Sequence, residues 1–142
     1  KYKSKFRIVP LNFGEYDNRK VMDCEEVGVE NKDLSFKDYL YIRVLALLVE
    51  TLHNGKPFYE FFKFSRKFDI QPASLLKILY DNISDSPKSL QKLINEFVNE
   101  TKNELWDTEE NLVKHYKKDK NYLKLKKGKV GGNLIFNINQ KV

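Results

Sequence analysis

The segment from Phe36 to Leu52 constrains the fold most strongly, because apolar residues occupy almost every face of a helix drawn through it. These residues are Leu40, Ile42, Val44, Leu45, Ala46, Leu47, Leu48, Val49 and Leu52. A helix that is apolar on most faces is buried by its neighbours. Ser35 is a good N-cap residue, and Asp38 follows three residues later as in a capping box. We therefore predict a buried central helix over about 36–53.

Four further helices are expected after the central one, which makes about five in a helical body at 34–119. Aromatic residues crowd the first, at 58–68. The second starts at Gln71-Pro72, and the third follows Ser86-Pro87, where proline suits the first helical turn. The fourth begins at the capping sequence 107–110 and continues to about Lys118.

The two ends of the chain carry strand patterns instead. Residues 1–33 are expected to be extended, with β-like runs at 6–11 and 20–30 separated by a turn cluster at 13–18. At the other end, Tyr122–Lys126 and 133–139 alternate around a glycine-rich turn, which is typical of a β-hairpin. The predicted fold is therefore α+β, mainly α, with N-terminal extended strand segments and a C-terminal hairpin within 120–142. At 142 residues, we expect a single domain.

Composition excludes several classes of site. Cys24 is the one cysteine, which excludes an intrachain disulfide framework, a cysteine-based zinc site and a cysteine-held iron–sulfur cluster in this chain. With two histidines, a histidine-rich metal site is not expected either.

No apolar run is long enough to span a membrane, and the N-terminus lacks a signal-peptide pattern. A cytoplasmic location is therefore predicted. Because the first residue is Lys, we expect a C-terminal piece of a longer protein.

Positive charge is concentrated near the C-terminus. Residues 114–129 hold eight lysines and one acid, a net charge of +7, whereas residues 1–113 sum to −2. One interpretation is a strip that binds an anionic partner, nucleic acid or a membrane surface. The other is a solvated lysine-rich face, because the segment contains no Arg and lysines complement the end of a helix dipole. The candidate anion-binding residues are Lys117, Lys118, Lys124, Lys126, Lys127 and Lys129.

The central helix also carries polar candidates. Glu50 and His53 lie three residues apart, so both can face one pocket as an acid–base pair or a carboxylate-oriented imidazole. Alternatively, His53 simply complements the helix end. Arg43 lies within the apolar run and is either an anchor for a substrate or partner, or an arginine that extends to solvent. No phosphate-binding glycine loop or nucleophile elbow is present, so no catalytic residue and no metal ligand is predicted.

Several short motifs occur in this chain in an order that is similar to the order of motifs in one known family. They are Phe13–Tyr16 (Phe-Gly-Glu-Tyr), Glu25–Glu30, Leu34–Tyr39, Arg43–Gly55 and Gly131–Ile135. This order resembles the C-terminal part of cobalamin-binding-type radical SAM proteins, beyond their catalytic barrel. The matches cover about half of the chain.

The resemblance implies a non-catalytic accessory domain that closes a substrate cavity or docks a partner. Members of the family hold a [4Fe–4S] cluster with a CxxxCxxC loop and cleave S-adenosylmethionine, and some bind cobalamin. Neither that loop nor a cobalamin motif is present, so no cofactor is expected in this chain. The implied partner is an upstream catalytic domain. Tyr16, Arg43, Glu50 and His53 are the residues expected to face that partner or its substrate.

Two alternatives from other functional classes come from the residues themselves. The first is an anion-binding module that uses the basic segment Lys114–Lys129. The second is a helical protein–protein interaction domain that uses the aromatic segment Phe58–Phe68. The oligomeric state does not follow from either pattern.

Overall fold

The computed structural model describes residues 2–131 and residue 135. The chain divides into two compact units. The first, which we call the hairpin unit, comprises residues 1–39 and 99–142, and the second, the helical unit, comprises residues 40–98. The division falls within two helices, α1 (Phe36–Leu48) and α4 (Lys88–Asn103).

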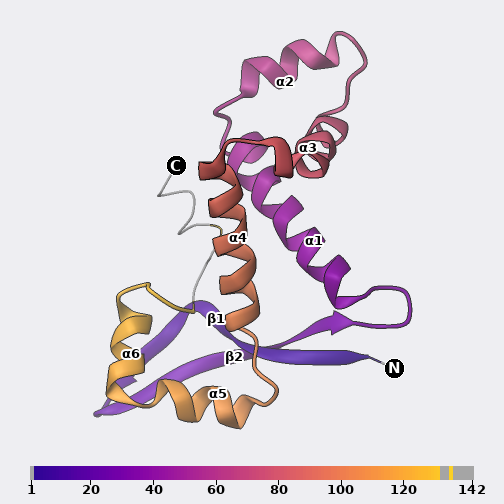
Figure 1. Cartoon of the computed structure of the whole chain (residues 1–142). Helices are drawn as coiled ribbons and strands as arrows, with labels where there is room; N and C mark the ends of the chain where they lie inside the picture. Colours follow the sequence, from indigo (N-terminus) through magenta and orange to yellow (C-terminus); the bar gives the residue numbers. More distant parts are fainter. Residues whose placement is uncertain (1, 132–134, 136–142) are drawn as a thin grey trace. The chain divides into compact units, whose positions relative to one another are not determined.

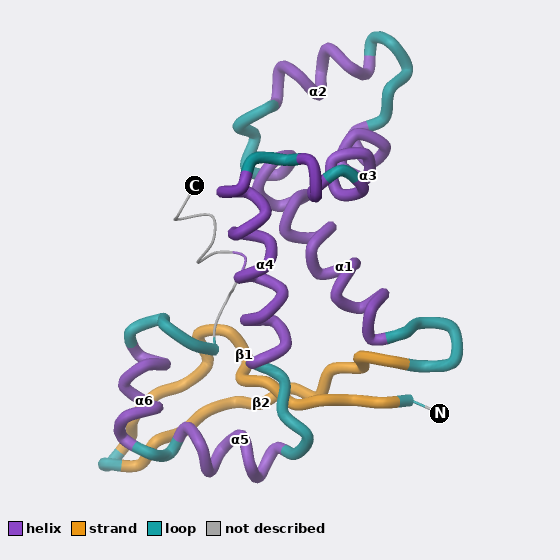
Figure 2. The backbone as a smooth tube through the Cα atoms, in the orientation of Figure 1, coloured by secondary structure: helices purple, strands orange, loops and turns teal. Residues whose placement is uncertain are grey.

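The hairpin unit begins with two long antiparallel strands, β1 (Lys3–Tyr16) and β2 (Arg19–Glu30), drawn in orange in Figure 2. Asp17 and Asn18 join them with φ angles of 47° and 58°. Positive φ at both central positions is typical of a type I′ hairpin turn, and Asp and Asn tolerate it. The predicted extended N-terminus is therefore a hairpin. The turn is shorter than the expected cluster at 13–18, because Phe13–Tyr16 pair with β2.

An irregularity bends this hairpin near its middle. Ile8 pairs with Cys24 and Phe13 pairs with Met22, so the intervening residues of β1 outnumber those of β2. Pro10 has no N–H group to donate to the ladder, and Leu11 has a φ of 64°. An extra loop of chain in one strand increases the local twist and bends the hairpin.

Two short helices cover the bent hairpin, α5 (Glu109–Tyr116) and α6 (Asp119–Lys126), as Figure 1 shows. Thr108 caps α5, since its side chain accepts a hydrogen bond from the backbone N–H of Asn111. The core between helices and strands consists of Ile8, Leu112, Tyr116, Tyr122 and Leu125. Phe6, Phe13, Met22, Cys24, Trp106 and Val130 pack around it.

Three consecutive residues of β1 hold the segment that precedes α5. Phe6 and Trp106 exchange two backbone hydrogen bonds of 2.8 Å. On one side of this pair, Lys5 forms an ion pair with Asp107. On the other, Arg7 Nη1 lies 3.2 Å from a carboxylate oxygen of Glu104, whose side chain is 6% exposed. These contacts fix the position of Trp106 at the start of α5.

The predicted C-terminal β-hairpin is wrong, and the hairpin of the described residues is N-terminal. Tyr122–Lys126, expected to be a strand, belongs to α6. The run Tyr-Leu-Lys-Leu-Lys fits both periods, but Tyr122 and Leu125 are buried while Leu123 is half-exposed. Burial three residues apart is the helical spacing. The other predicted strand, 133–139, lies outside the described residues except for residue 135.

The helical unit follows the order α1, a π-helical turn η1 (Val49–Asn54), α2 (Tyr59–Arg66), α3 (Pro72–Asp81), a 3₁₀ turn η2 (Ile83–Asp85) and α4. The described residues thus contain six α-helices, one more than expected. Buried apolar side chains come from α1, α2, α3 and α4. They are Val44, Leu47, Leu48, Phe62, Leu76, Ile94 and Phe97. Burial of α1 is one-sided, because Ile42 remains 49% exposed.

The π-helical turn ends α1 in an unusual way. Gly55 N–H donates to the carbonyl of Glu50, five residues earlier, over 3.0 Å, and the Thr51 hydroxyl donates to the carbonyl of Leu47 over 2.8 Å. A Cβ atom at Gly55 would lie 3.2 Å from the carbonyl oxygen of Thr51, a close approach that disfavours a larger residue here. The left-handed residue that reverses the chain is Lys56, with a φ of 62°.

The core of the hairpin unit gives a direct stability prediction. Leu112 is fully buried, so Leu112→Ala should lower the free energy of unfolding by about 2–5 kcal/mol. Leu123→Ala on α6 makes the same chemical change at a half-exposed position and should cost less than about 1 kcal/mol. Urea unfolding followed by circular dichroism measures both. Equal losses would contradict the packing of α5 against the hairpin.

Candidate functional site

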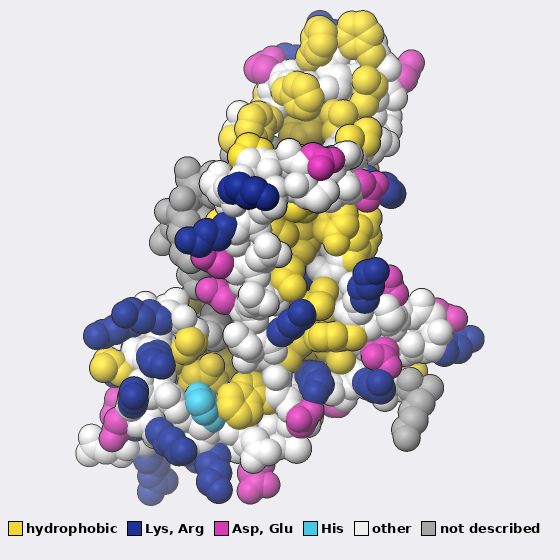
Figure 3. Space-filling view, in the orientation of Figure 1, with side chains coloured by type: hydrophobic (Ala, Val, Ile, Leu, Met, Phe, Trp, Pro, Cys, Tyr) yellow, Lys and Arg dark blue, Asp and Glu magenta, His cyan; other side chains and the backbone are white. Residues whose placement is uncertain are grey.

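Eight exposed lysines gather on α5, α6 and the residues that follow them, and we call this set the lysine surface. They are Lys114, Lys117, Lys118, Lys120, Lys124, Lys126, Lys127 and Lys129. Figure 3 shows the corresponding cluster of basic side chains over the two helices. All six lysines predicted to bind anions belong to it. Because Tyr122 and Leu125 are buried, the lysines of α6 lie on its exposed side.

Most of this charge lacks a counter-ion within the described residues. Among contacts between described residues, Lys126 alone of the eight lysines forms an ion pair, with Glu15 at 3.3 Å. The one acid in the segment, Asp119, pairs with Lys20 of β2, whose ammonium also donates to the carbonyl of Lys117 over 2.9 Å. This pairing lowers the pKa of Asp119, because Lys20 hydrogen-bonds and attracts its charged form. Seven ammonium groups therefore remain uncompensated by carboxylates in the described chain.

A shallow pocket of about 370 Å³ borders the lysine surface on α5. Trp106, Asn111, Lys114, His115 and Lys118 line it together with Asp107. The charge of Asp107 is compensated by Lys5. The Trp106 ring lies 4.8 Å from the His115 ring, and an edge contact of 6.4 Å joins it to Tyr116. The pocket thus combines a fixed aromatic ring with an amide and two ammonium groups.

The pKa of His115 is lowered by its surroundings, which include neighbouring lysines. Partial burial lowers its pKa below the ordinary value of 6.5, and the charges of Lys118 and Lys124 lower it further. The imidazole is therefore neutral at pH 7. A neutral ring beside an aromatic side chain leaves the lysines as the cations of this pocket.

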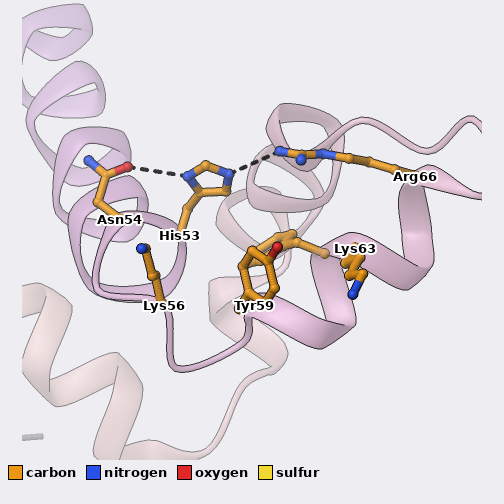
Figure 4. A pocket seen from close by; sticks show the side chains of 7 residues that line it. His53, Asn54, Lys56, Tyr59, Lys63 and Arg66 are labelled. Atoms are coloured by element: carbon orange, nitrogen blue, oxygen red, sulfur yellow. Dashed lines mark hydrogen bonds between the residues drawn. The ribbon is translucent and has the colours of Figure 1, made fainter.

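A second pocket, of about 340 Å³, lies in the helical unit where η1 meets α2, and we call it the π-turn pocket. His53, Asn54 and Lys56 line it from the turn, and Tyr59, Phe62, Lys63 and Arg66 line it from α2. Figure 4 shows the Arg66 guanidinium next to the His53 imidazole, joined to it by a dashed line. Tyr59, Lys63 and Arg66 share one face of α2, because they are spaced by four and three residues.

A chain of hydrogen bonds orients the histidine of this pocket. The Asn54 amide donates to Oε2 of Glu50 over 2.8 Å, and its oxygen lies 3.2 Å from Nδ1 of His53. On the other side of the ring, Nε2 lies 3.5 Å from an Arg66 nitrogen. Glu50 and His53, predicted to act as a pair, each contact Asn54, and their role as an acid–base pair stays a prediction.

The predicted site residues lie in different surroundings. Tyr16, 70% exposed, is the last residue of β1 in the hairpin unit. Arg43 belongs to α1, and its guanidinium carbon lies 5.7 Å from the centre of the Phe97 ring. His53 lines the π-turn pocket, whereas Glu50 is not among its lining residues and accepts a hydrogen bond from Asn54, which is.

The aromatic segment 58–68 is divided between burial and exposure. Phe62 packs inside and is 6% exposed, whereas Phe61, Phe64 and Phe68 are each more than half exposed. Within α2, helical spacing places Phe61 and Phe64 on the side opposite Tyr59, Lys63 and Arg66, and Phe68 follows the end of the helix. The segment thus presents an apolar stripe to solvent in the described chain.

Sequence reasoning missed the side chains that complete both pockets. Lys63 and Arg66 follow Tyr59 at helical spacing. This spacing is present in the sequence, but the phenylalanines between these residues made the segment look apolar throughout. Arg66 meets His53 from 13 residues away, which no local pattern predicts. Trp106 lines its pocket from a segment that is paired with Phe6 of β1, about 100 residues earlier in the sequence, a contact that no local pattern predicts.

Comparisons with protein-family models, curated proteins and solved structures found no match. Within the described part of the chain, no helix is both long and apolar enough to cross a membrane. The same residues contain no cluster of three or more His, Cys, Asp or Glu side chains suited to a metal ion.

The depressed pKa of His115 gives a pH prediction. The unfolded chain binds a proton at about pH 6.5 while the folded chain does not, so the contribution of His115 to stability is present above pH 6.5 and lost as the pH falls below it. Thermal unfolding between about pH 7.5 and 5.5 should show this loss, and His115→Gln should flatten the profile. An unchanged profile in the variant would contradict the assignment to His115.

Proposed function

We propose that this chain is a binding module that holds single-stranded nucleic acid on the lysine surface. The observation that carries the proposal is the set of seven exposed lysines without a carboxylate partner in the described chain. Uncompensated ammonium groups attract a phosphate backbone and release its condensed counter-ions on binding. Lysine is a compact point charge, which suits contact with successive phosphates without sequence preference.

The pocket at Trp106 favours a single strand among the possible polyanions. Single-stranded nucleic acid exposes the faces of its bases, which stack on aromatic side chains beside a basic track. Trp106 lies in such a position, since Lys114 and Lys118 line the same pocket. The Asn111 amide there adds a donor and an acceptor for a base edge.

A membrane surface is less well supported as the partner of these lysines. A helix that lies on a bilayer inserts an apolar face into it. The apolar side chains Tyr122 and Leu125 of α6 are already buried against the hairpin, which leaves Leu123 alone on the exposed side. An electrostatic partner that needs no insertion fits this arrangement better.

The resemblance to radical SAM accessory regions stays a prediction, because no comparison bears on it. The accessory-domain prediction and the nucleic-acid proposal are compatible in one respect, since both describe a chain that binds a partner and carries out no catalysis itself. The geometry of the described residues supports the nucleic-acid proposal more directly.

Fluorescence anisotropy with a labelled single-stranded RNA of about 20 nucleotides tests the proposal. We expect a Kd of about 1–100 μM near physiological salt, with a logarithmic salt slope of about −0.7 for each phosphate contact. Replacing Lys114, Lys117 and Lys118 by Gln should weaken binding and make the slope shallower by about 2. The fluorescence of Trp106, the one tryptophan of the sequence, should be quenched on binding.

The matched control replaces Lys32, Lys37 and Lys92 by Gln, which removes the same charge outside the lysine surface. This control should retain affinity and slope. Heparin, a polyanion without bases, should compete for the lysines without quenching Trp106. Equal weakening in both triple variants, or binding to anionic vesicles but not to RNA, would contradict the proposal.

A further inference from the structure

The π-turn pocket has the composition of an anion site, and it is separate from the lysine surface. Three cationic side chains line it, Lys56, Lys63 and Arg66. Among the described residues that line it, none is Asp or Glu. Glu50 is engaged by Asn54 over 2.8 Å, and the ammonium of Lys63 lies 3.7 Å from Glu60, an exposed contact at a distance where little charge is neutralised.

Arg66 is the most informative member of this set. Within the described residues its guanidinium forms no ion pair, and its polar contact is the 3.5 Å approach to Nε2 of His53. The same imidazole lies 3.2 Å from the side-chain oxygen of Asn54, whose amide nitrogen donates to Glu50, so polar neighbours orient the ring that the guanidinium approaches. The contact with His53 positions the guanidinium at the pocket while most of its N–H donors stay available.

The remaining walls set the shape of a ligand. Tyr59 and Phe62 supply ring surfaces beside the cations, and Figure 4 shows the Tyr59 ring between Lys56 and Lys63. A guanidinium binds an oxyanion through two parallel N–H donors, and ammonium groups add charge without such geometry. A dianion of tetrahedral shape therefore matches this set better than a single carboxylate. The ring surfaces suit an organic body attached to that dianion.

We propose that the π-turn pocket binds a phosphate monoester, with Arg66 gripping the phosphate oxygens, Lys56 and Lys63 balancing its charge, and Tyr59 and Phe62 contacting the esterified group. A phosphate monoester carries a charge of about −1.5 to −2 at pH 7, which three cations accommodate. This inference goes beyond the proposed function, because it concerns a small ligand, other residues and the other unit of the chain.

Titration of the full ¹⁵N-labelled chain tests the proposal with three probes: phenyl phosphate, inorganic phosphate and acetate. Phenyl phosphate should shift the amide signals of residues 53–66 saturably, with a Kd of about 1 mM or below. Inorganic phosphate should shift the same signals with weaker affinity, because it lacks the ring that contacts Tyr59 and Phe62. This difference separates a free phosphate site from a site for an esterified one.

Substitutions then assign the contact. Arg66→Gln should weaken phenyl phosphate binding about tenfold or more, because it removes a charge-assisted bidentate contact. Arg66→Lys keeps the charge but loses the fork, and should recover only part of the affinity. The matched control is Lys67→Gln, which removes a charge from the next residue, outside the pocket lining, and should change the affinity less than about twofold.

Several results would overturn the proposal. They are the absence of a saturable shift up to about 10 mM phenyl phosphate, equal affinity for acetate, and equal weakening by Arg66→Gln and Lys67→Gln. Circular dichroism checks that each variant is folded, and Arg66→Lys serves as the test if Arg66→Gln is not. Arg66→Gln should leave RNA binding at the lysine surface unchanged, so either proposal can fail without the other.

Discussion

The burial of Tyr122 and Leu125 against Ile8 and Leu112 is the interaction on which the basic face of the hairpin unit depends. Because α6 buries its apolar side chains in this core, its lysines lie on the opposite face of the helix and are exposed to solvent. The contacts of Lys5, Phe6 and Arg7 with the segment before α5 complete the arrangement. A hydrophobic core of modest size thus determines where an electrostatic surface forms.

The two proposed sites would hold anions in chemically different ways. The lysine surface consists of separate, hydrated point charges on helices, an arrangement that tolerates variation in spacing and sequence along a polymer. The π-turn pocket instead has one guanidinium 3.5 Å from His53, and two aromatic rings line the same cavity. Affinity on the first surface depends on how many contacts form at once, whereas affinity in the pocket depends on how well one contact is oriented.

Local signals in the sequence predicted the helices well, because caps and prolines act over a few residues. Ser35 and Asp38 form the expected reciprocal capping bonds, and α5 begins within the expected capping sequence 107–110, where Thr108 is the capping residue. The prediction failed at Tyr122–Lys126, where a five-residue run fits both helix and strand and only packing against a distant hairpin decides. The π-turn pocket could be predicted only in part. His53 was a candidate because it lies near Glu50 in the sequence, whereas Arg66 approaches His53 only because the chain reverses at Lys56.

The π-helical turn has a consequence for how variation in this chain would be tolerated. In a π-helical turn the N–H group bonds to the carbonyl five residues earlier, so the turn holds one residue more than an α-helical turn. Adding or removing one residue in a helix rotates the part that follows by about 100° around the helix axis. The direction in which the His53 imidazole points is therefore encoded in residue count as well as in residue identity. Related chains that keep every pocket side chain but lose one position between Val49 and Asn54 would aim the imidazole away from the guanidinium, so length conservation in this turn is as informative as the conservation of any single side chain.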